Sequence, residues 1–379
     1  MITETYIYQN NQWNRDPFNC SDSENNLVLI FGNDKEEAKK IIDHYKKSII
    51  AGVSTVTNLA PDSHHLKDAL VVSIMKFEKT TLRAHYTHFK DYDSSLSVAE
   101  EIVNELDQYE NLKGVLTFSD AVMMSGTQFS EGLKFLNNKN VHLAGSIASG
   151  KDIHNTFMYS RNGAEQYGAM AIGFYGDDLF FSSTIGTGAK AFGIERIASK
   201  CDKNILYEID NSPAFDLYKK YLSNDFAEIR EQFDVIAYQF PIAVTKVLEL
   251  KEEYVRTPVG LTEDGSGIIL AGEIKEGSTI RLMRTTSDNF LDGAENAAHE
   301  VFEVGRPVDT SNFRSLIINC EARRATLGES LEDEAASINK ILNIESIGTH
   351  YSFGELCHNQ SGCGLMHTQT IVILVIGEL

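Results

Sequence analysis

Hydrophobic and polar positions alternate along the chain in an order that predicts strands and helices, and the same order occurs twice. In the first half, apolar runs predict strands at residues 69–77, 81–89, 114–118, 141–144 and 167–174. Between them, apolar residues recur every three or four positions, the spacing of one helix face. The two helical stripes contain Ala99, Ile102, Val103 and Leu106, and then Phe129, Leu133 and Leu136. The predicted order is β-β-α-β-α-β-β.

The second half shows the same order. Strands are predicted at residues 268–271, 279–283, 315–319, 344–347 and 370–376, with helical stripes through Leu291, Ala294, Ala298 and Val301, and through Leu331, Ala335, Ile338 and Leu342. Leu116 and Gly145 are 29 residues apart, and Ile317 and Gly348 are 31 apart. We therefore expect a mixed α/β (α+β) fold of two tandem units, with mixed sheets flanked by helices. The alternative is ordinary α/β alternation without duplication.

If the units are related, the strands at 114–118 and 315–319 hold equivalent central positions in their sheets. Polar residues 1–26 are expected to form a lead-in with an edge strand at 5–8, followed by domains at 27–228 and 229–379. The polar stretch 223–232 is the predicted boundary. The Gly176-Asp177-Asp178 sequence predicts a hairpin turn between strands at 169–174 and 179–185.

Composition and charge narrow the function classes. The chain has 34 basic and 54 acidic residues, a net charge of −20. Such a chain is repelled by phosphate backbones and anionic lipid, so we expect neither nucleic acid nor membrane as a partner. The longest apolar run, residues 370–376, is too short to span a bilayer, and the first residues do not resemble a secretory signal. Five cysteines without a CxxC pair favour a reducing, cytoplasmic location.

Six short segments, in order, resemble motifs of the FIST sensory protein family. They are VHLAGSIA (141–148), ILYEIDNSPA (205–214), RTP (256–258), INCEAR (318–323), YSFGEL (351–356) and HTQT (367–370). Two segments depart from the family pattern. Residues 51–58, AGVSTVTN, lack the cysteine and the Gly-Glu pair usual there, and Thr368 replaces the usual asparagine. Roles carried by those groups do not transfer to this chain.

The resemblance implies an N-terminal and a C-terminal FIST domain. It further implies a cytoplasmic sensory module that binds small ligands such as amino acids, without enzymatic activity or a cofactor. Relatives accompany signalling proteins of the kinase and chemoreceptor type, which are therefore the expected protein partners. A ligand-free interaction scaffold is a third possibility beside a sensor and an enzyme.

Distinctive side chains gather near one predicted strand end. Asn319, Cys320 and Arg323 lie where a strand ends and a helix begins, a junction whose free N–H groups favour an anion. Arg323 can bind a carboxylate through two parallel hydrogen bonds, and Glu355 can accept an ammonium group. One cation and one anion together predict a free amino acid as ligand. The alternatives are a local ion pair of Arg323, for example with Glu329, and a solvated turn carboxylate at Glu355.

Neighbouring positions complete the expected site. Tyr351 and Phe353 are expected to line an apolar pocket for the ligand side chain, and Gly354 permits a tight turn or close backbone approach. His367 is included from the family resemblance. If the units are duplicated, Asp120 occupies the place of Glu321, with small residues nearby that let a ligand or another backbone approach. The full expected set is Asn319, Cys320, Arg323, Tyr351, Phe353, Gly354, Glu355, His367, Gly145, Ser146 and Asp120.

Two other chemistries are possible for the same residues. Cys320 is either a buried core residue or a nucleophile, and a nucleophile requires a base such as a histidine within reach. Cys357, His358, Cys363 and His367 are ligand types for zinc, but their spacing is not a recognised one. We therefore expect no bound metal.

Overall fold

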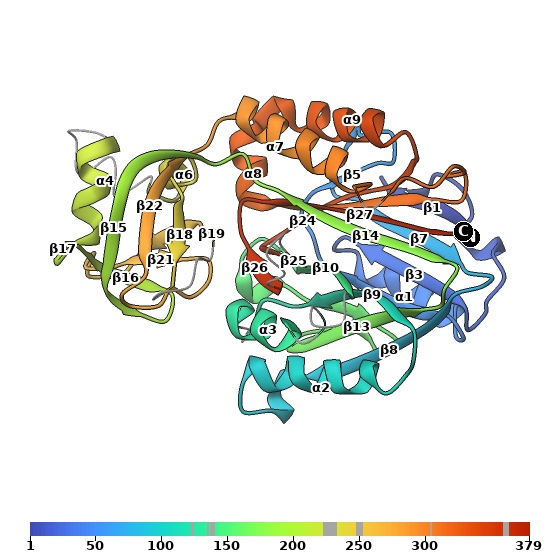
Figure 1. The fold of residues 1–379 in the computed structure, drawn as a ribbon. Helices are drawn as coiled ribbons and strands as arrows, with labels where there is room; N and C mark the ends of the chain where they lie inside the picture. The colour runs from blue at the N-terminus through green and yellow to red at the C-terminus, as the bar shows by residue number, and fades with distance from the viewer. Residues whose placement is uncertain are drawn as a thin grey trace.

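The computed structural model of the protein describes residues 1–122, 125–134, 136, 141–222, 233–247, 253–303, 305–358 and 364–379. It shows a large domain of three mixed sheets and a smaller domain built from residues between β14 and α7 (Figure 1). Helices flank the sheets. The expected mixed α/β fold class is therefore confirmed.

Each of the three sheets of the large domain contains both parallel and antiparallel strand pairs. In spatial order, the first sheet consists of β2 (Gln12–Trp13), β1 (Ile2–Gln9), β7 (Leu70–Lys76), β3 (Asn26–Phe31), β4 (Ile49–Val53), β11 (Met158–Ser160) and β12 (Gly163–Glu165). The second consists of β8 (Thr81–His88), β13 (Gly168–Tyr175), β9 (Leu112–Ser119), β10 (His142–Ile147), β25 (Gly354–His358) and β26 (Gly364–His367).

The third sheet is assembled from both ends of the chain. In spatial order it consists of β14 (Leu179–Gly186), β27 (Ile371–Glu378), β23 (Arg314–Cys320), β24 (Glu345–Ser352), β5 (Asn58–Leu59) and β6 (His65–Leu66). The outer faces of the three sheets carry the helices α1 (Lys35–His44), α2 (Ser95–Asp107), α3 (Gly126–Leu133), α7 (Ser287–Glu300), α8 (Glu321–Leu327) and α9 (Leu331–Leu342). Figure 1 shows α7 and α9 on one side of the large domain, with α2 and α3 on the opposite side.

All three sheets have the same strand order. A central strand (β3, β9 or β23) pairs in parallel with the next strand in the chain (β4, β10 or β24) on one side. On its other side it pairs antiparallel with β7, β13 or β27. The strands at 114–118 and 315–319 thus lie at the equivalent central positions we expected. The sheet around β3 is a third copy of the arrangement, which the hydrophobic pattern did not reveal.

The sheets exchange hairpins in a cycle. The chain leaving β4 of the first sheet adds the hairpin β5–β6 to the third sheet, beside β24. The chain leaving β24 adds β25–β26 to the second sheet, beside β10. The chain leaving β10 adds β11–β12 to the first sheet, beside β4. Each sheet is therefore completed by a segment that belongs to another.

The inner faces of the three sheets enclose one shared hydrophobic core. Leu29 from β3, Phe118 from β9 and Ile318 from β23 all belong to it. Alternate residues of the same strands, such as Val28 and Ile317, face the outer helices instead. Strands buried on both faces explain why these segments appear as continuous apolar runs in the sequence.

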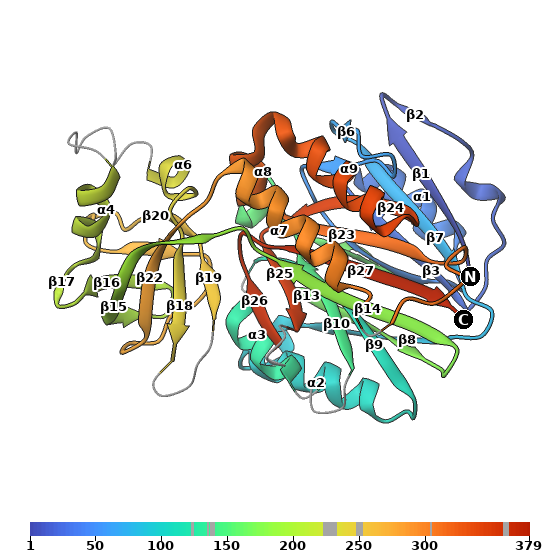
Figure 2. The same cartoon turned by 45° about the horizontal axis from the view of Figure 1, so that its top comes forward.

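The smaller domain has its own sheet and its own core. The sheet runs β19 (Tyr254–Arg256), β18 (Ile242–Lys246), β22 (Thr279–Arg284), β15 (Lys190–Asp202), β16 (Ile205–Ile209), β21 (Ile268–Leu270) and β20 (Pro258–Leu261), with β17 (Ser212–Pro213) beside β16. Helices α4 (Ala214–Leu222) and α6 (Phe233–Ala237) pack on it. Figure 2 shows this domain at one end of the molecule, joined to the rest next to α7 and α8.

Two details differ from the expected topology. The strands predicted at 268–271 and 279–283 as part of the second unit are β21 and β22 of the smaller domain, and β14 is the strand at the edge of the sheet around β23. The turn at Gly176 does not close a hairpin either, because β14 pairs with β27 and not with β13. Apolar runs specify that a strand is buried, but they do not specify its partner.

Candidate functional site

Two of the family-like segments meet where the smaller domain contacts the large one. Arg256 is almost fully buried, and its guanidinium donates a hydrogen bond to the carbonyl of Met366 (3.0 Å). The backbone N–H of Thr257 donates to the hydroxyl of Thr368 (3.1 Å). The side-chain amide of Gln369 donates to the carbonyl of Tyr238 in the smaller domain (2.8 Å). These contacts hold the segment 366–369 between the domains.

Glu355 lies in a fully buried polar cluster next to this segment. Its carboxylate accepts hydrogen bonds from the hydroxyls of Ser352 (2.7 Å) and Thr370 (2.8 Å) and from the backbone N–H of Thr370 (3.3 Å). Burial dominates over these hydrogen bonds and raises the pKa of Glu355 to about 7. Glu355 is therefore a buried residue and not a solvated turn carboxylate, and its pKa lies close to neutral pH.

Cys320 contacts the same cluster and is not activated as a nucleophile. Its sulfur accepts a hydrogen bond from the backbone N–H of Gln369 (3.2 Å). Burial, with a smaller contribution from the charge of Glu355, raises the pKa of the thiol well above its usual range. Within the described residues, no histidine forms a hydrogen bond with Cys320. The geometry matches the core alternative for this cysteine.

Arg323 is fully buried and its donors go to protein groups. It forms an ion pair with Glu334, which is also buried, and donates to the carbonyl of Phe290 (3.0 Å) and the side-chain oxygen of Asn319 (3.1 Å). Its guanidinium carbon lies 4.1 Å from the centre of the Phe290 ring. Asn319 in turn donates to Glu334 (2.5 Å). The local acid is thus Glu334 on α9, and not Glu329.

The remaining expected residues lie at the edges of the exchanged strands. Tyr351 is fully buried, and its hydroxyl accepts a hydrogen bond from Asn319 (3.4 Å). The backbone N–H of Phe353 donates to the carbonyl of Ile147 (3.2 Å). Gly354 and Glu355 pair with Ile147 and Ser146 across β25 and β10. These residues thus occupy the crossing between the third sheet and the second.

The expected site residues of the N-terminal unit, Gly145, Ser146 and Asp120, contact other protein groups. The hydroxyl of Ser146 forms a hydrogen bond with Nε2 of His350 (2.9 Å), whose ring stacks on Phe31. Gly145 lies against β9, and a Cβ there would be 2.4 Å from the carbonyl oxygen of Thr117. Gly145 thus permits the close approach of a backbone, one of the two roles expected for a small residue here.

Asp120 is buried at the end of β9 and anchors the following loop. Its carboxylate accepts hydrogen bonds from the backbone N–H groups of Val122 (3.0 Å) and Tyr167. Burial is the largest influence and raises the pKa of Asp120 to about 7. The loop that leaves β9 is held against the start of β13 by these bonds.

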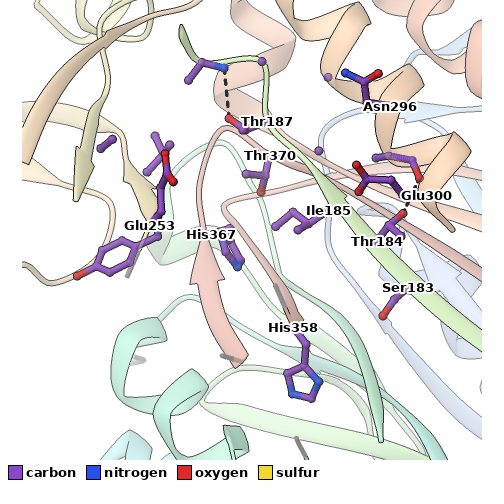
Figure 3. Close-up of a pocket in the computed structure, with 18 of the residues that line it drawn as sticks. Ser183, Thr184, Ile185, Thr187, Glu253, Asn296, Glu300, His358, His367 and Thr370 are labelled. Carbon is purple, nitrogen blue, oxygen red and sulfur yellow. Dashed lines mark hydrogen bonds between the residues drawn. The ribbon is translucent and has the colours of Figure 1, made fainter. Parts of the chain in front are cut away.

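A cavity of about 850 Å³ lies between the two domains, beside the segment 366–370 (Figure 3). Its wall contains residues 183–190 of β14 and the turn after it, Gly293, Asn296, Ala297 and Glu300 of α7, Ala243, Glu253, Tyr254, Val255 and Met283 of the smaller domain, and Val141, His142, His358, His367 and Thr370. This size suits a small organic ligand. Of the residues expected to bind a ligand, His367 lines this cavity, and Thr370 connects its wall to Glu355.

Most of the cavity wall was not foreseen from the sequence. The one available signal was the glycine pair Gly186 and Gly188, which is too weak to indicate a phosphate loop. The structure gives it another role, since β14 and the turn after it pack directly on α7. A Cβ at Gly188 would lie 2.2 Å from the carbonyl oxygen of Asn289, and a Cβ at Gly186 would lie 2.4 Å from that of Gly293.

The structure places the cysteine and histidine residues considered for zinc in different surroundings. Cys357 is buried in the shared core, and burial raises the pKa of its thiol to about 12. His358 and His367 line the cavity, and Cys363 lies outside the described residues. No group of three or more His, Cys, Asp or Glu residues able to hold a metal ion occurs among those that are described.

A ligand-sized cavity at the junction of two α/β domains is typical of small-molecule binding proteins. The family models agree with this class: a FIST N domain matches residues 26–212 and a FIST C domain matches residues 214–358. The chain belongs to the FIST family, whose domains are sensory, signal-transduction domains that bind small ligands. A comparison with curated proteins gives no match. No helix in the described ranges is long and apolar enough to cross a membrane.

Proposed function

We propose that this protein is a sensor that binds a small ligand in the cavity between its two domains. The observation that carries the proposal is the cavity of about 850 Å³, whose wall is formed by residues of both domains together with His367 and Thr370. Ligand sites of this size occur preferentially at domain interfaces. Because both domains line the cavity, an occupant contacts both.

The role is proposed to be non-catalytic. Cys320, the candidate nucleophile, is buried and has a pKa well above its usual range. A signalling protein of the kinase or chemoreceptor type is the proposed downstream partner, and the cytoplasm the proposed location. The proposed partner rests on the family resemblance alone, and the proposed location rests on that resemblance and on the cysteine content.

A free amino acid remains the ligand proposed from the charges of Arg323 and Glu355. Because Arg323 is already paired with Glu334, a carboxylate would have to replace that partner. The proposed contact of an amino acid with Glu355 is easier to reach, since Thr370 joins the Glu355 carboxylate to the cavity wall. These ligand contacts stay predictions.

The test is a thermal-shift screen of metabolites, including all amino acids, on the wild type and on Asn296→Trp. Asn296 lies on α7 at the cavity wall, so the tryptophan fills part of the space. A ligand at 100 times its Kd raises the free energy of unfolding by about 2.7 kcal/mol. We expect this shift in the wild type and its loss in Asn296→Trp.

The matched control is His299→Trp, an exposed position on the same helix that does not line the cavity. It should keep the ligand response of the wild type. If no metabolite shifts the wild-type transition, or if Asn296→Trp responds like the control, the proposed site is wrong. For an amino-acid ligand, calorimetry on Arg323→Lys and Glu355→Gln decides whether these residues bind it, since equal affinity in all three proteins would exclude both.

A further inference from the structure

The cavity borders β14 along the edge of the strand and not along one of its faces. Four consecutive residues of this strand, 183–186, line the cavity (Figure 3), although successive side chains of a strand point to opposite faces of its sheet. The hydroxyl of Ser183 donates to the carbonyl of Leu143 in β10 (2.9 Å). The hydroxyl of Thr184 donates to the carbonyl of Ala297 in α7 (2.9 Å). Because both side chains border the same space, the cavity follows the strand edge between β10 and α7.

This edge of β14 carries main-chain groups without a strand partner. Among the described strands, β14 pairs with β27 alone. The N–H of Leu379 donates to the carbonyl of Asp178 (2.8 Å) at the start of this antiparallel ladder, so every second residue from Asp178 onward directs its main chain to β27. Ser183 and Ile185 therefore direct their N–H and C=O groups to the other edge, which borders the cavity. No hydrogen bond joins these four groups to a described residue.

The sequence of β14 lacks the features that usually protect a strand edge. Leu179–Gly186 is LFFSSTIG, without a charged residue and without proline. Its register with β27 runs through all eight pairs without a bulge. Edges that do not pair with another chain usually carry charges, proline or a bulge. The edge that borders the cavity is therefore able to accept a further strand.

The walls on the two sides of this edge suit the side chains of such a strand. One side is formed by α7, with Asn296 and Glu300, and the other contains His142 and His358. Successive side chains of a bound strand would point to these two sides in turn. The volume of about 850 Å³ lies in the range of small-ligand sites, and residues 183–186 provide a pairing length for about four peptide residues.

We propose that the cavity binds a short extended peptide, which pairs with the edge of β14 as an additional strand. This assignment rests on the proposed ligand-binding function and adds the ligand's chemical class. The N–H and C=O groups of Ser183 and Ile185 would each gain a main-chain partner. In this mode of recognition the main-chain hydrogen bonds give affinity and the walls select side chains. A free amino acid is too short to pair with both residues.

The first experiment selects a ligand from a random pentapeptide library that is acetylated at the N-terminus and amidated at the C-terminus. No terminal charge then contributes to binding. We expect the wild type and His299→Trp to retain the same set of peptides, identified by mass spectrometry. Asn296→Trp, whose tryptophan fills part of the cavity, should retain none of them. The absence of any retained peptide overturns the assignment, as does retention of the same set by folded Asn296→Trp.

The second experiment tests the main-chain pairing with the tightest peptide of this selection. Its amide nitrogens are methylated one at a time, and calorimetry measures the affinity of each product for the wild type. A strand directs alternate N–H groups to opposite edges. Methylation should therefore lower the affinity about five-fold or more at every second position, with a smaller effect at the positions between. Equal effects at all positions, or no effect at any, overturn the pairing.

A matched pair of variants changes the edge itself. Ile185→Pro removes an N–H that faces the cavity and leaves the pairing with β27 in place, since proline is tolerated where an edge N–H is unpaired. Ile185→Ala shortens the same side chain and keeps the N–H. We expect the proline variant to bind the selected peptide about five-fold or more weakly than the alanine variant. Equal affinity in the two folded proteins contradicts the assignment, and if circular dichroism shows Ile185→Pro to be unfolded, the methylation pattern decides.

The outcomes separate this assignment from the function on which it rests. If the metabolite screen yields a ligand that Asn296→Trp excludes and the library yields no peptide, the sensor function stands and the peptide assignment fails. If a selected peptide is excluded by Asn296→Trp and shows the alternating methylation pattern, both stand. If neither screen yields a ligand, both fail.

Discussion

At the scale of single residues, the site depends on polar groups that the fold holds in unusual protonation states. Glu355 is surrounded by hydroxyls and by the thiol of Cys320, with no cation paired to it in the described residues. Its raised pKa means that the folded protein binds a proton at pH values where the unfolded chain has already released it. Stability therefore changes with pH through this one carboxyl.

We expect Glu355→Gln to remove a specific part of the pH dependence of stability. Because the folded pKa of about 7 lies above the ordinary value of 4.5, the contribution of Glu355 is complete below pH about 4.5 and is lost as pH rises to about 7. For one group this amounts to about 3 kcal/mol. Urea unfolding of both proteins between pH 4.5 and 8 measures it. Asp120 and the buried histidines are present in the wild type and in Glu355→Gln, so they affect both proteins equally. An equal change of unfolding free energy with pH in the two proteins would contradict the prediction. The control is Glu110→Gln, at an exposed position.

At the scale of elements, the three crossing segments between exchanged strands are joined by hydrogen bonds at one place. The hydroxyls of Thr55 (2.8 Å) and Ser149 (2.7 Å) both donate to the carbonyl of Tyr351. The N–H of Ser149 donates to the carbonyl of Ser54 (3.0 Å), and the N–H of Tyr351 donates to that of Thr57 (3.2 Å). These residues are buried, so their backbone groups depend on these partners.

A double-mutant cycle at this crossing should be non-additive. Thr55→Val or Ser149→Ala alone leaves the Tyr351 carbonyl with one donor, and each should lower the free energy of unfolding by about 1 kcal/mol. The double variant leaves that carbonyl without either hydroxyl, so its loss should exceed the sum by about 1 kcal/mol or more. Denaturant unfolding of the four proteins gives the coupling energy. Additivity within about 0.5 kcal/mol would mean that the two hydroxyls act independently.

At the scale of the molecule, the smaller domain is inserted between two elements that lie in contact. Within the described residues, its strands β15 to β22 pair with one another and with no strand of the large domain. Gly188 at the start of the insertion packs against Asn289 at the start of α7. The large domain therefore does not need the insertion to bring these ends together.

We expect a variant with residues 190–285 replaced by a short Gly-Ser linker to fold. It loses the hydrogen bonds from Arg256 and Thr257 to the segment 366–368, so its melting temperature should fall. It also loses one wall of the cavity, so the ligand response should disappear. Circular dichroism and the thermal-shift assay test both points. An unfolded variant would show that the domains depend on each other for stability.

The sequence reveals some levels of this organisation and not others. The sequence predicts equivalent central positions for residues 114–118 and 315–319 because the same order of apolar strands and helical stripes occurs in both halves. An ion pair of Arg323 is among the alternatives that the sequence offers, but the sequence does not identify its partner. Glu329 is nearer to Arg323 along the chain, whereas the packing of α8 and α9 makes Glu334 the partner in space. The cavity could not be predicted from the sequence, because its wall is formed by β14, α7 and the smaller domain. Local sequence patterns do not specify how these elements lie relative to one another.

The cyclic exchange of hairpins also determines when the molecule can be completed during synthesis. The first sheet needs only residues up to Glu165, but the second waits for β25 and β26, and β5 stays without its partner until β24 has emerged. Asn58 pairs with His350, 292 positions later. Such distant pairing slows folding and leaves strand edges exposed on the nascent chain. Once the cycle has closed, no sheet can come apart without taking a strand from its neighbour, so the native state should persist through a slow unfolding rate.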